Sequence, residues 1–121
     1  MMSFMKIYRF NNKANLNVLL YFIQRVDIVN AKLEETLLLL TLEIINLGCP
    51  NLNHLDISYN PAGMHLINLL KICVETHDLK ELILAGMGIT SKMICLLSIG
   101  IANNNTLEEL DLRENFISLI Y

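Results

Sequence analysis

Apolar and polar residues alternate in one recurring pattern along this 121-residue chain. The pattern LxxLxLxxN, or a close variant of it, fits residues 52–60, 79–87 and 107–115. A weaker match, IQRVDIVNA, begins at Ile23, so the four segments start 29, 27 and 28 residues apart. Each segment alternates as a strand does. Self-similarity at a nearly fixed period predicts a structural unit that repeats along the chain.

Between these segments the apolar residues are spaced three and four apart, which predicts a helix after each strand. We expect the following residues to face the core: Leu33, Leu37, Leu40 and Ile44; Leu66, Leu69, Leu70 and Cys73; Met93, Leu96, Leu97, Ile99 and Gly100. Thr90 and Ser91 have the side chains of a helix N-cap. Turn-forming residues at 48–51, 76–78 and 103–106 end the helices.

One strand and one helix cannot bury an apolar face by themselves, so stacked units must share a continuous core. The leucine-type positions of each strand segment therefore point inward, and the residues between them point outward. Asn60 and Asn115 follow their strands where the backbone must turn, and an amide can bond backbone groups left unpaired there. Ala31 and Met87 hold the same position and cannot do so.

These residues carry a family likeness. NNNTLEELDLRENFI (103–117) resembles leucine-rich repeats of the ribonuclease-inhibitor-like subclass, which also occur in NOD-like receptors, Ran GTPase-activating proteins and tropomodulin-like proteins. GCPNLNHLDIS (48–58) is similar to the cysteine-containing repeats of F-box proteins, although Asn60 stands at the second cysteine position. The resemblance implies an α/β solenoid of about three to four repeats, with a curved parallel sheet on its concave side and helices on its convex side.

The chain is expected to divide into residues 1–22, an N-terminal extension or partial capping repeat, and residues 23–121, with repeat units starting near 23, 52, 79 and 107. The sequence stops at Tyr121, just after the fourth strand segment. An uncapped terminal repeat exposes core leucines. We therefore expect a fragment of a longer repeat protein. A truncated fragment that does not fold by itself is the alternative, and self-association through the uncapped end is a further outcome.

Composition narrows the class of protein. Hydrophobic residues make up 54% of the chain and the mean hydropathy is +0.46, which argues against disorder. The most apolar stretch, Leu37 to Leu47, contains Glu43 and is shorter than the ~20 residues that cross a bilayer, so we expect no membrane association. Cys49, Cys73 and Cys95 contain no CxxC pair, which predicts reduced, buried thiols in the cytoplasm or the nucleus.

Charge and spacing argue against several activities. The net charge is −3 and the basic residues are scattered, which is not the footprint of a nucleic-acid-binding protein. His54 and Asp56 lack the further ligands that a metal needs, and Ser58 beside them lacks an oxyanion site. Cys73 and His77 fit a buried thiol beside a histidine at a helix end. We therefore expect no catalytic residues, no metal and no cofactor.

The outward positions of the strands are the remaining candidates for function. The expected partner-binding residues are Arg25, Asp27, His54, Asp56, Ser58, Tyr59, Glu81, Ile83, Glu109, Asp111, Arg113 and Glu114. The central outward positions are three aspartates and Ile83. Neighbouring parallel strands lie about 4.8 Å apart, so these side chains would form an acidic row. The alternative is an ordinary solvated sheet face.

An acidic row with an exposed apolar residue suits a partner protein with a basic surface. The sequence therefore predicts a protein–protein interaction module that binds through its concave strand face. The resemblance also implies two alternatives: a regulator of an enzyme, of the GTPase-activating type, and an F-box-like substrate adaptor. Residues 1–22 are too short to hold an F-box.

Overall fold

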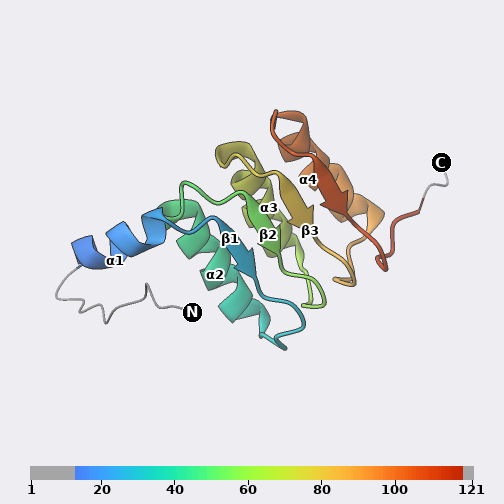
Figure 1. Cartoon of the computed structure of the whole chain (residues 1–121). Helices are drawn as coiled ribbons and strands as arrows, with labels where there is room; N and C mark the ends of the chain where they lie inside the picture. The colour runs from blue at the N-terminus through green and yellow to red at the C-terminus, as the bar shows by residue number, and fades with distance from the viewer. Residues whose placement is uncertain (1–12, 119–121) are drawn as a thin grey trace, which may run out of the picture.

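The computed structural model describes residues 13–118, which form four helices and four strands in strict alternation (Figure 1). The elements are α1 (Lys13–Tyr21), β1 (Arg25–Asp27), α2 (Glu35–Gly48), β2 (His54–Asp56), α3 (Met64–Thr76), β3 (Glu81–Ile83), α4 (Ser91–Ala102) and β4 (Glu109–Asp111). The helix α1 was not predicted from the sequence. The three later helices end where turn residues were expected.

The strands form one parallel sheet in the order β1-β2-β3-β4, so each strand pairs with the next one along the chain. Their first residues are 29, 27 and 28 positions apart, the same steps that separate the sequence segments. Figure 1 shows α2, α3 and α4 side by side behind one face of this sheet. The predicted α/β class is confirmed at this level: a four-stranded parallel sheet with four helices.

The backbone conformation after each strand repeats along the chain, as the leucine positions do. Asn30, Tyr59, Gly86 and Glu114 all lie in the left-handed region, with φ between 48° and 59°. They occupy the same position in the four successive segments, again 29, 27 and 28 residues apart. Left-handed backbone is uncommon outside glycine, so four occurrences at one position indicate that the same turn follows every strand.

The core is deepest in the middle of the sheet. Leu52, Leu55 and Ile57, and likewise Leu79, Leu82 and Leu84, have no exposed surface. The corresponding residues of the first and fourth segments are only partly buried: Ile23, Val26, Ile28, Leu107, Leu110 and Leu112. The predicted inward positions are thus confirmed, and their burial depends on whether a neighbouring unit covers them on both sides.

Helix α2 corrects one prediction. Leu37, Leu40 and Ile44 were expected in the core, but each is about half exposed. The buried residues are Leu38, Leu42 and Ile45. The sequence of α2 is apolar around most of its circumference, so two stripes with three-and-four spacing exist, and packing on the sheet selects one of them. None of the helices in the described part of the chain is long and apolar enough to span a membrane.

The other two helices match more closely. In α3, Leu66, Leu70 and Cys73 are buried as expected. In α4, Leu97 and Gly100 are buried, but Ile99 is exposed, which is a second correction. The predicted cap is confirmed, because Thr90 Oγ1 accepts the backbone N–H of Met93 at 3.3 Å. A Cβ on Gly100 would lie 2.8 Å from the carbonyl oxygen of Lys71, so glycine permits the close approach of α4 to α3.

The two asparagines have the predicted structural role. Asn60 Nδ2 donates to the carbonyl of Ile57 in its own unit and to that of Ile28 in the preceding one. Asn115 Nδ2 donates to Leu84 in the same way, while its Oδ1 accepts the N–H of Met87 at 2.9 Å. Met87 has no side-chain amide at this position, and the carbonyl of Leu84 in the same unit instead accepts a hydrogen bond from Asn115 of the next unit.

The cysteines agree with expectation only in part. Cys49 and Cys73 are buried, and burial raises the pKa of the Cys73 thiol to about 12, so it stays protonated. Cys95 is exposed, contrary to the prediction of three buried thiols. It lies on α4, on the side of the helix that faces away from the sheet core.

Candidate functional site

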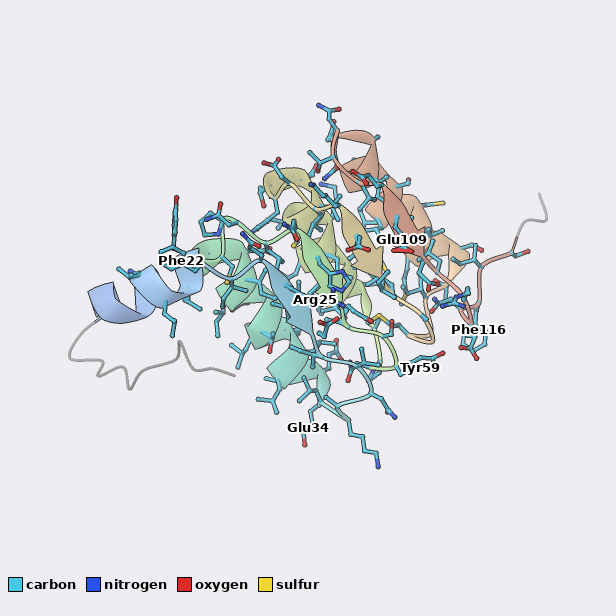
Figure 2. The ribbon with its side chains drawn as sticks, viewed as in Figure 1. Phe22, Arg25, Glu34, Tyr59, Glu109 and Phe116 are labelled. Atoms are coloured by element: carbon cyan, nitrogen blue, oxygen red, sulfur yellow. The ribbon has the colours of Figure 1, made fainter. Side chains whose placement is uncertain are left out.

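The face of the sheet opposite the helices, called here the open sheet face, presents two rows of side chains in register. Figure 2 labels Arg25 on β1 and Glu109 on β4. One row is Arg25, His54, Glu81 and Glu109. The other is Asp27, Asp56, Ile83 and Asp111. Both rows consist of residues that were expected on the outward face, and the second is the acidic row expected from the sequence. Strand neighbours in a parallel sheet are about 4.8 Å apart, so adjacent members of a row interact directly.

His54 connects three strands of the open sheet face. Its Nε2 lies 3.0 Å from Asp27 Oδ1 on β1, and its Nδ1 lies 3.0 Å from Glu81 Oε1 on β3. The residue was expected to be exposed, but it is 6% exposed because these neighbours cover the ring. A protonated imidazole donates to both carboxylates, whereas a neutral ring donates to only one of them.

Arg25 completes this arrangement at the β1 end. Its Nε donates to Asp27 Oδ2 at 2.5 Å. This hydrogen bond, and secondarily the one from His54, lowers the pKa of Asp27 below its ordinary value. The pKa of Glu81 is also lowered, chiefly by the hydrogen bond from His54. The first of the predicted aspartates is therefore already paired within the protein.

A second internal pair lies at the β4 end. Arg113 Nε lies 3.0 Å from both carboxylate oxygens of Asp111, and Nη2 donates to Oδ2 at 2.7 Å. The hydrogen bonds from Arg113 lower the pKa of Asp111. Since the guanidinium is largely exposed, it stays available to solvent or to a partner while it holds the aspartate.

Three members of the two rows take no part in these pairs or in the His54 bridge: Asp56 on β2, Ile83 on β3 and Glu109 on β4, which we call the central patch. Asp56 Oδ1 accepts the backbone N–H of Ser58 at 3.0 Å. Within the described residues, neither Asp56 nor Glu109 forms an ion pair with a cationic side chain. Ile83 is half-buried beside Asp56 in the same row. The central patch thus combines two carboxylates without side-chain counterions with one apolar side chain.

Ser58 departs from its predicted position. It was expected on the outward face but is 2% exposed, and its Oγ accepts the backbone N–H of Ala85 at 3.0 Å. The reason is that β2 ends at Asp56, so the alternation of faces does not continue two residues further. Ser58 therefore links two units through its buried hydroxyl.

Tyr59 and Glu114 interact across a glycine. The Tyr59 O–H donates to Glu114 Oε2, and this hydrogen bond raises the pKa of the phenol. The ring lies over Gly86, where a Cβ would approach two ring carbons to 2.3 Å. Tyr59 is 44% exposed, so one side of its ring packs against the protein and the other faces solvent.

Sequence reasoning proposed Tyr59 and Glu114 for the surface but missed that they bond each other. It also missed the role of Gly86. A signal was present in the sequence, because Tyr59, Gly86 and Glu114 hold the same position in three successive units. The bridge through His54 had no comparable signal, since it depends on the register between strands.

The residues weighed for chemistry have structural roles. His77 is buried, with Nδ1 3.1 Å from the carbonyl of Cys73 and Nε2 3.2 Å from the carbonyl of Ile45, as the simpler interpretation predicted. Across the part of the chain that the structure describes, no group of three or more His, Cys, Asp or Glu side chains could hold a metal ion.

The charge of the open sheet face and its flanking turn is strongly one-sided. Six of the chain's twelve acidic residues lie there, against two of its nine basic residues. The acids are Asp27, Asp56, Glu81, Glu109, Asp111 and Glu114, and the cations are Arg25 and Arg113. The surface is therefore more acidic than the protein as a whole.

In comparisons with known proteins, no family model and no curated protein matches the sequence.

Proposed function

We propose that this chain is a leucine-rich repeat solenoid of the ribonuclease-inhibitor-like subclass, which binds a partner protein through its open sheet face. Three features support the repeat assignment: strands 27 to 29 residues apart, a left-handed residue after each strand, and asparagines that bond the preceding unit. Parallel strands joined by helices are the arrangement that such repeats use.

The central patch is the observation that carries the binding function. Asp56 and Glu109 lack side-chain counterions among the described residues, and Ile83 lies between their strands. Lysine or arginine side chains of a partner would pair with the two carboxylates, and an apolar side chain would cover Ile83. Charge complementarity provides orientation and fast association, while the apolar contact provides an anchor.

The flanking pairs support the same proposal. Arg25 and Arg113 are each held by an aspartate on their own strand segment. Side chains that are already ordered lose less conformational entropy when a partner binds. These pairs therefore hold the two ends of the row that contains Asp56 and Ile83, and the carboxylates left without a side-chain counterion in the central patch are Asp56 and Glu109.

The test is a binding selection with the purified chain against a displayed library of random peptides. We expect the recovered peptides to be rich in lysine and arginine with at least one large apolar residue. Binding of each recovered peptide is then measured for the variants Asp56→Lys and Glu109→Lys. Either charge reversal should abolish detectable binding, and raising the salt concentration should slow association, because surface charges are screened.

Asp56→Asn is the matched variant, because its side-chain oxygen can still accept the N–H of Ser58 while the charge is lost. It should weaken binding less than Asp56→Lys does. Glu34→Lys, on the loop before α2, is the control for an acid away from the face. Peptides that bind equally to the native chain and to both charge-reversal variants at the central patch would refute the proposed site.

A further inference from the structure

The side of α2 that faces away from the sheet carries an uncovered apolar stripe. It consists of Leu37, Leu40, Ile44 and Leu47, spaced three, four and three residues apart, and we call it the α2 stripe. The exposed fractions are 50%, 49%, 54% and 90%. Residues at this spacing lie on one side of a helix. A continuous exposed apolar surface of this kind marks a place where another segment binds.

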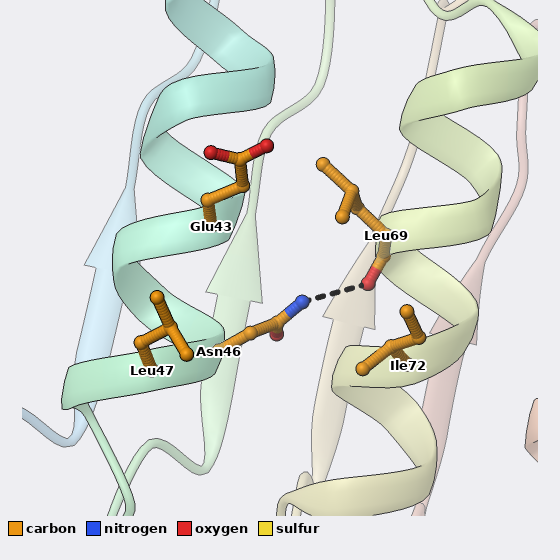
Figure 3. A pocket seen from close by; sticks show the side chains of 5 residues that line it. All are labelled: Glu43, Asn46, Leu47, Leu69 and Ile72. Atoms are coloured by element: carbon orange, nitrogen blue, oxygen red, sulfur yellow. Dashed lines mark hydrogen bonds between the residues drawn. The ribbon is translucent and has the colours of Figure 1, made fainter.

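The stripe borders a shallow hollow between α2 and α3 of about 250 Å³, lined by Glu43, Asn46, Leu47, Leu69 and Ile72 (Figure 3). Asn46 Nδ2 donates to the carbonyl of Leu69 at 3.1 Å. Its Oδ1 is buried and has no partner within the described residues. The apolar surface thus continues from α2 onto α3 and contains one acceptor that is not satisfied.

The charge along α2 itself is negative, and the basic residue nearest to it in the sequence is Lys32 on the preceding loop. Glu34 and Glu35 lie at the start of α2 and Glu43 lies beside Leu47, and residues 33–48 contain no lysine or arginine. All three carboxylates are exposed. A segment that covers the stripe should therefore combine large apolar side chains with cations and should lack acidic residues.

Residues 1–12 have this composition. Their sequence, MMSFMKIYRFNN, contains seven large apolar or aromatic residues, the cations Lys6 and Arg9, and no acid. We propose that residues 1–12, which lie outside the described part of the chain, dock on the α2 stripe. Their apolar side chains cover the leucines, and Lys6 and Arg9 pair with the glutamates at its border. This contact does not depend on the binding function proposed for the sheet.

The chain is long enough for this contact. The end of α1 packs on the end of α2, where a Cβ on Gly48 would lie 2.9 Å from Leu20 Cδ1. The nine residues of α1 and the fourteen of α2 measure about 13 Å and 21 Å. Twelve extended residues span about 40 Å, which exceeds the two lengths together. The tether also holds the segment near its site at an effective concentration in the millimolar range.

The experiment uses a single tryptophan, because the chain contains none. Ile44→Trp places the reporter on the α2 stripe, and Ile99→Trp places it at the corresponding position of α4, where the native residue is similarly exposed. Both are measured in the full chain by acrylamide quenching. The quenching constant of Ile44→Trp should be lower by about twofold, because a covered indole is removed from water. The added double substitution Lys6→Glu/Arg9→Glu should raise it to the value of Ile99→Trp.

Circular dichroism of every variant checks that the fold is retained. Equal quenching at the two positions in the otherwise native chain would overturn the proposal. Protection of Ile44→Trp that depends on protein concentration would also overturn it, because a second copy would then be the occupant. Neither result bears on the peptide selection.

Discussion

The middle and the ends of the sheet contain the same residue pattern in different surroundings. Leu55 on β2 and Leu82 on β3 have no exposed surface. Val26 on β1 and Leu110 on β4 hold the same positions in their segments but are only partly buried. The pattern determines which way a side chain points, whereas the neighbouring units determine how deeply it is buried.

This difference has an energetic consequence. β2 and β3 each pair with two strands, and β1 and β4 each pair with one. In a stacked array, the stability of a unit depends on its own contacts and on the interfaces with its neighbours. The middle units should therefore be the most stable part of the protein, and they hold most of the central patch.

The largest effect should come from removing a middle leucine. Leu82→Ala leaves a cavity in a closed core and should cost about 2–5 kcal/mol of unfolding free energy. Leu110→Ala, its counterpart on β4, should cost clearly less, because that site is partly open to water. Urea unfolding of both variants measures the difference. Equal losses would break the distinction between middle and end.

A smaller loss is expected at the turn between units. Gly86 and Gly88 both have positive φ, so alanine is strained at either position by about 1 kcal/mol. Only Gly86 lies under the Tyr59 ring; a Cβ on Gly88 would meet nothing within 4 Å. Gly86→Ala should therefore lower the urea midpoint more than Gly88→Ala. The excess should vanish in the Tyr59→Ala background, and an undiminished excess would contradict the role of the ring.

The asparagines give the next comparison. Asn60→Ala leaves carbonyl groups of Ile57 and Ile28 without their amide partner, at a cost of about 1–3 kcal/mol. Asn115→Ala should cost less, because its surroundings are partly exposed and water can replace the amide. Thermal unfolding of the two variants tests this order. A greater loss at Asn115 would mean that its bonds to the N–H groups of the preceding unit outweigh burial.

The smallest effect concerns pH and the joining of β1 to β2. The pKa values of Asp27 and Glu81 are lowered in the folded protein, so their contribution is present above the unfolded values of about 3.9 and 4.3. It is lost as the pH falls through the folded values. Asp27→Asn should therefore be less stable than the native chain at pH 6.5, and the gap in urea midpoint should narrow at pH 3.

Asp78→Asn is the control for this pH experiment, because Asp78 is exposed and its side chain makes no hydrogen bond or ion pair within the described residues. The difference in urea midpoint between this variant and the native chain should change less between pH 6.5 and pH 3. A gap for Asp27→Asn that stays constant from pH 6.5 to pH 3 would show that the charge of Asp27 does not hold β1 to the sheet.

Local sequence predicted those features that depend on local geometry. The inward positions of Leu55 and Leu82 and the cap at Thr90 follow from spacing and from side-chain chemistry. Ser58 could not be placed, because the length of a three-residue strand is set by its partners. The buried side of α2 was also out of reach, since the helix offers two apolar stripes and only the packed sheet chooses between them.

The candidate site was predicted in outline and changed in detail. The row through Asp56 and Ile83 was found from alternation and period, and the strands align it as expected. The pairing of Asp27 with Arg25 and His54 could not be read from the sequence, because it requires the register between β1 and β2. Because of this pairing, the proposed binding site is the central patch and not the whole acidic row.

Native-state hydrogen exchange tests the central claim most directly. The amides of Ile28, Ile57 and Leu84 each donate to a carbonyl of the next strand, so they differ mainly in the neighbours around them. The Ile57 amide, which bonds β2 to β3, should exchange only through global unfolding, whereas the amides of Ile28 and Leu84, whose bonds join a middle strand to an end strand, should exchange through local openings of lower free energy. One common opening free energy for all three amides would contradict the account that neighbouring units set the stability of each unit.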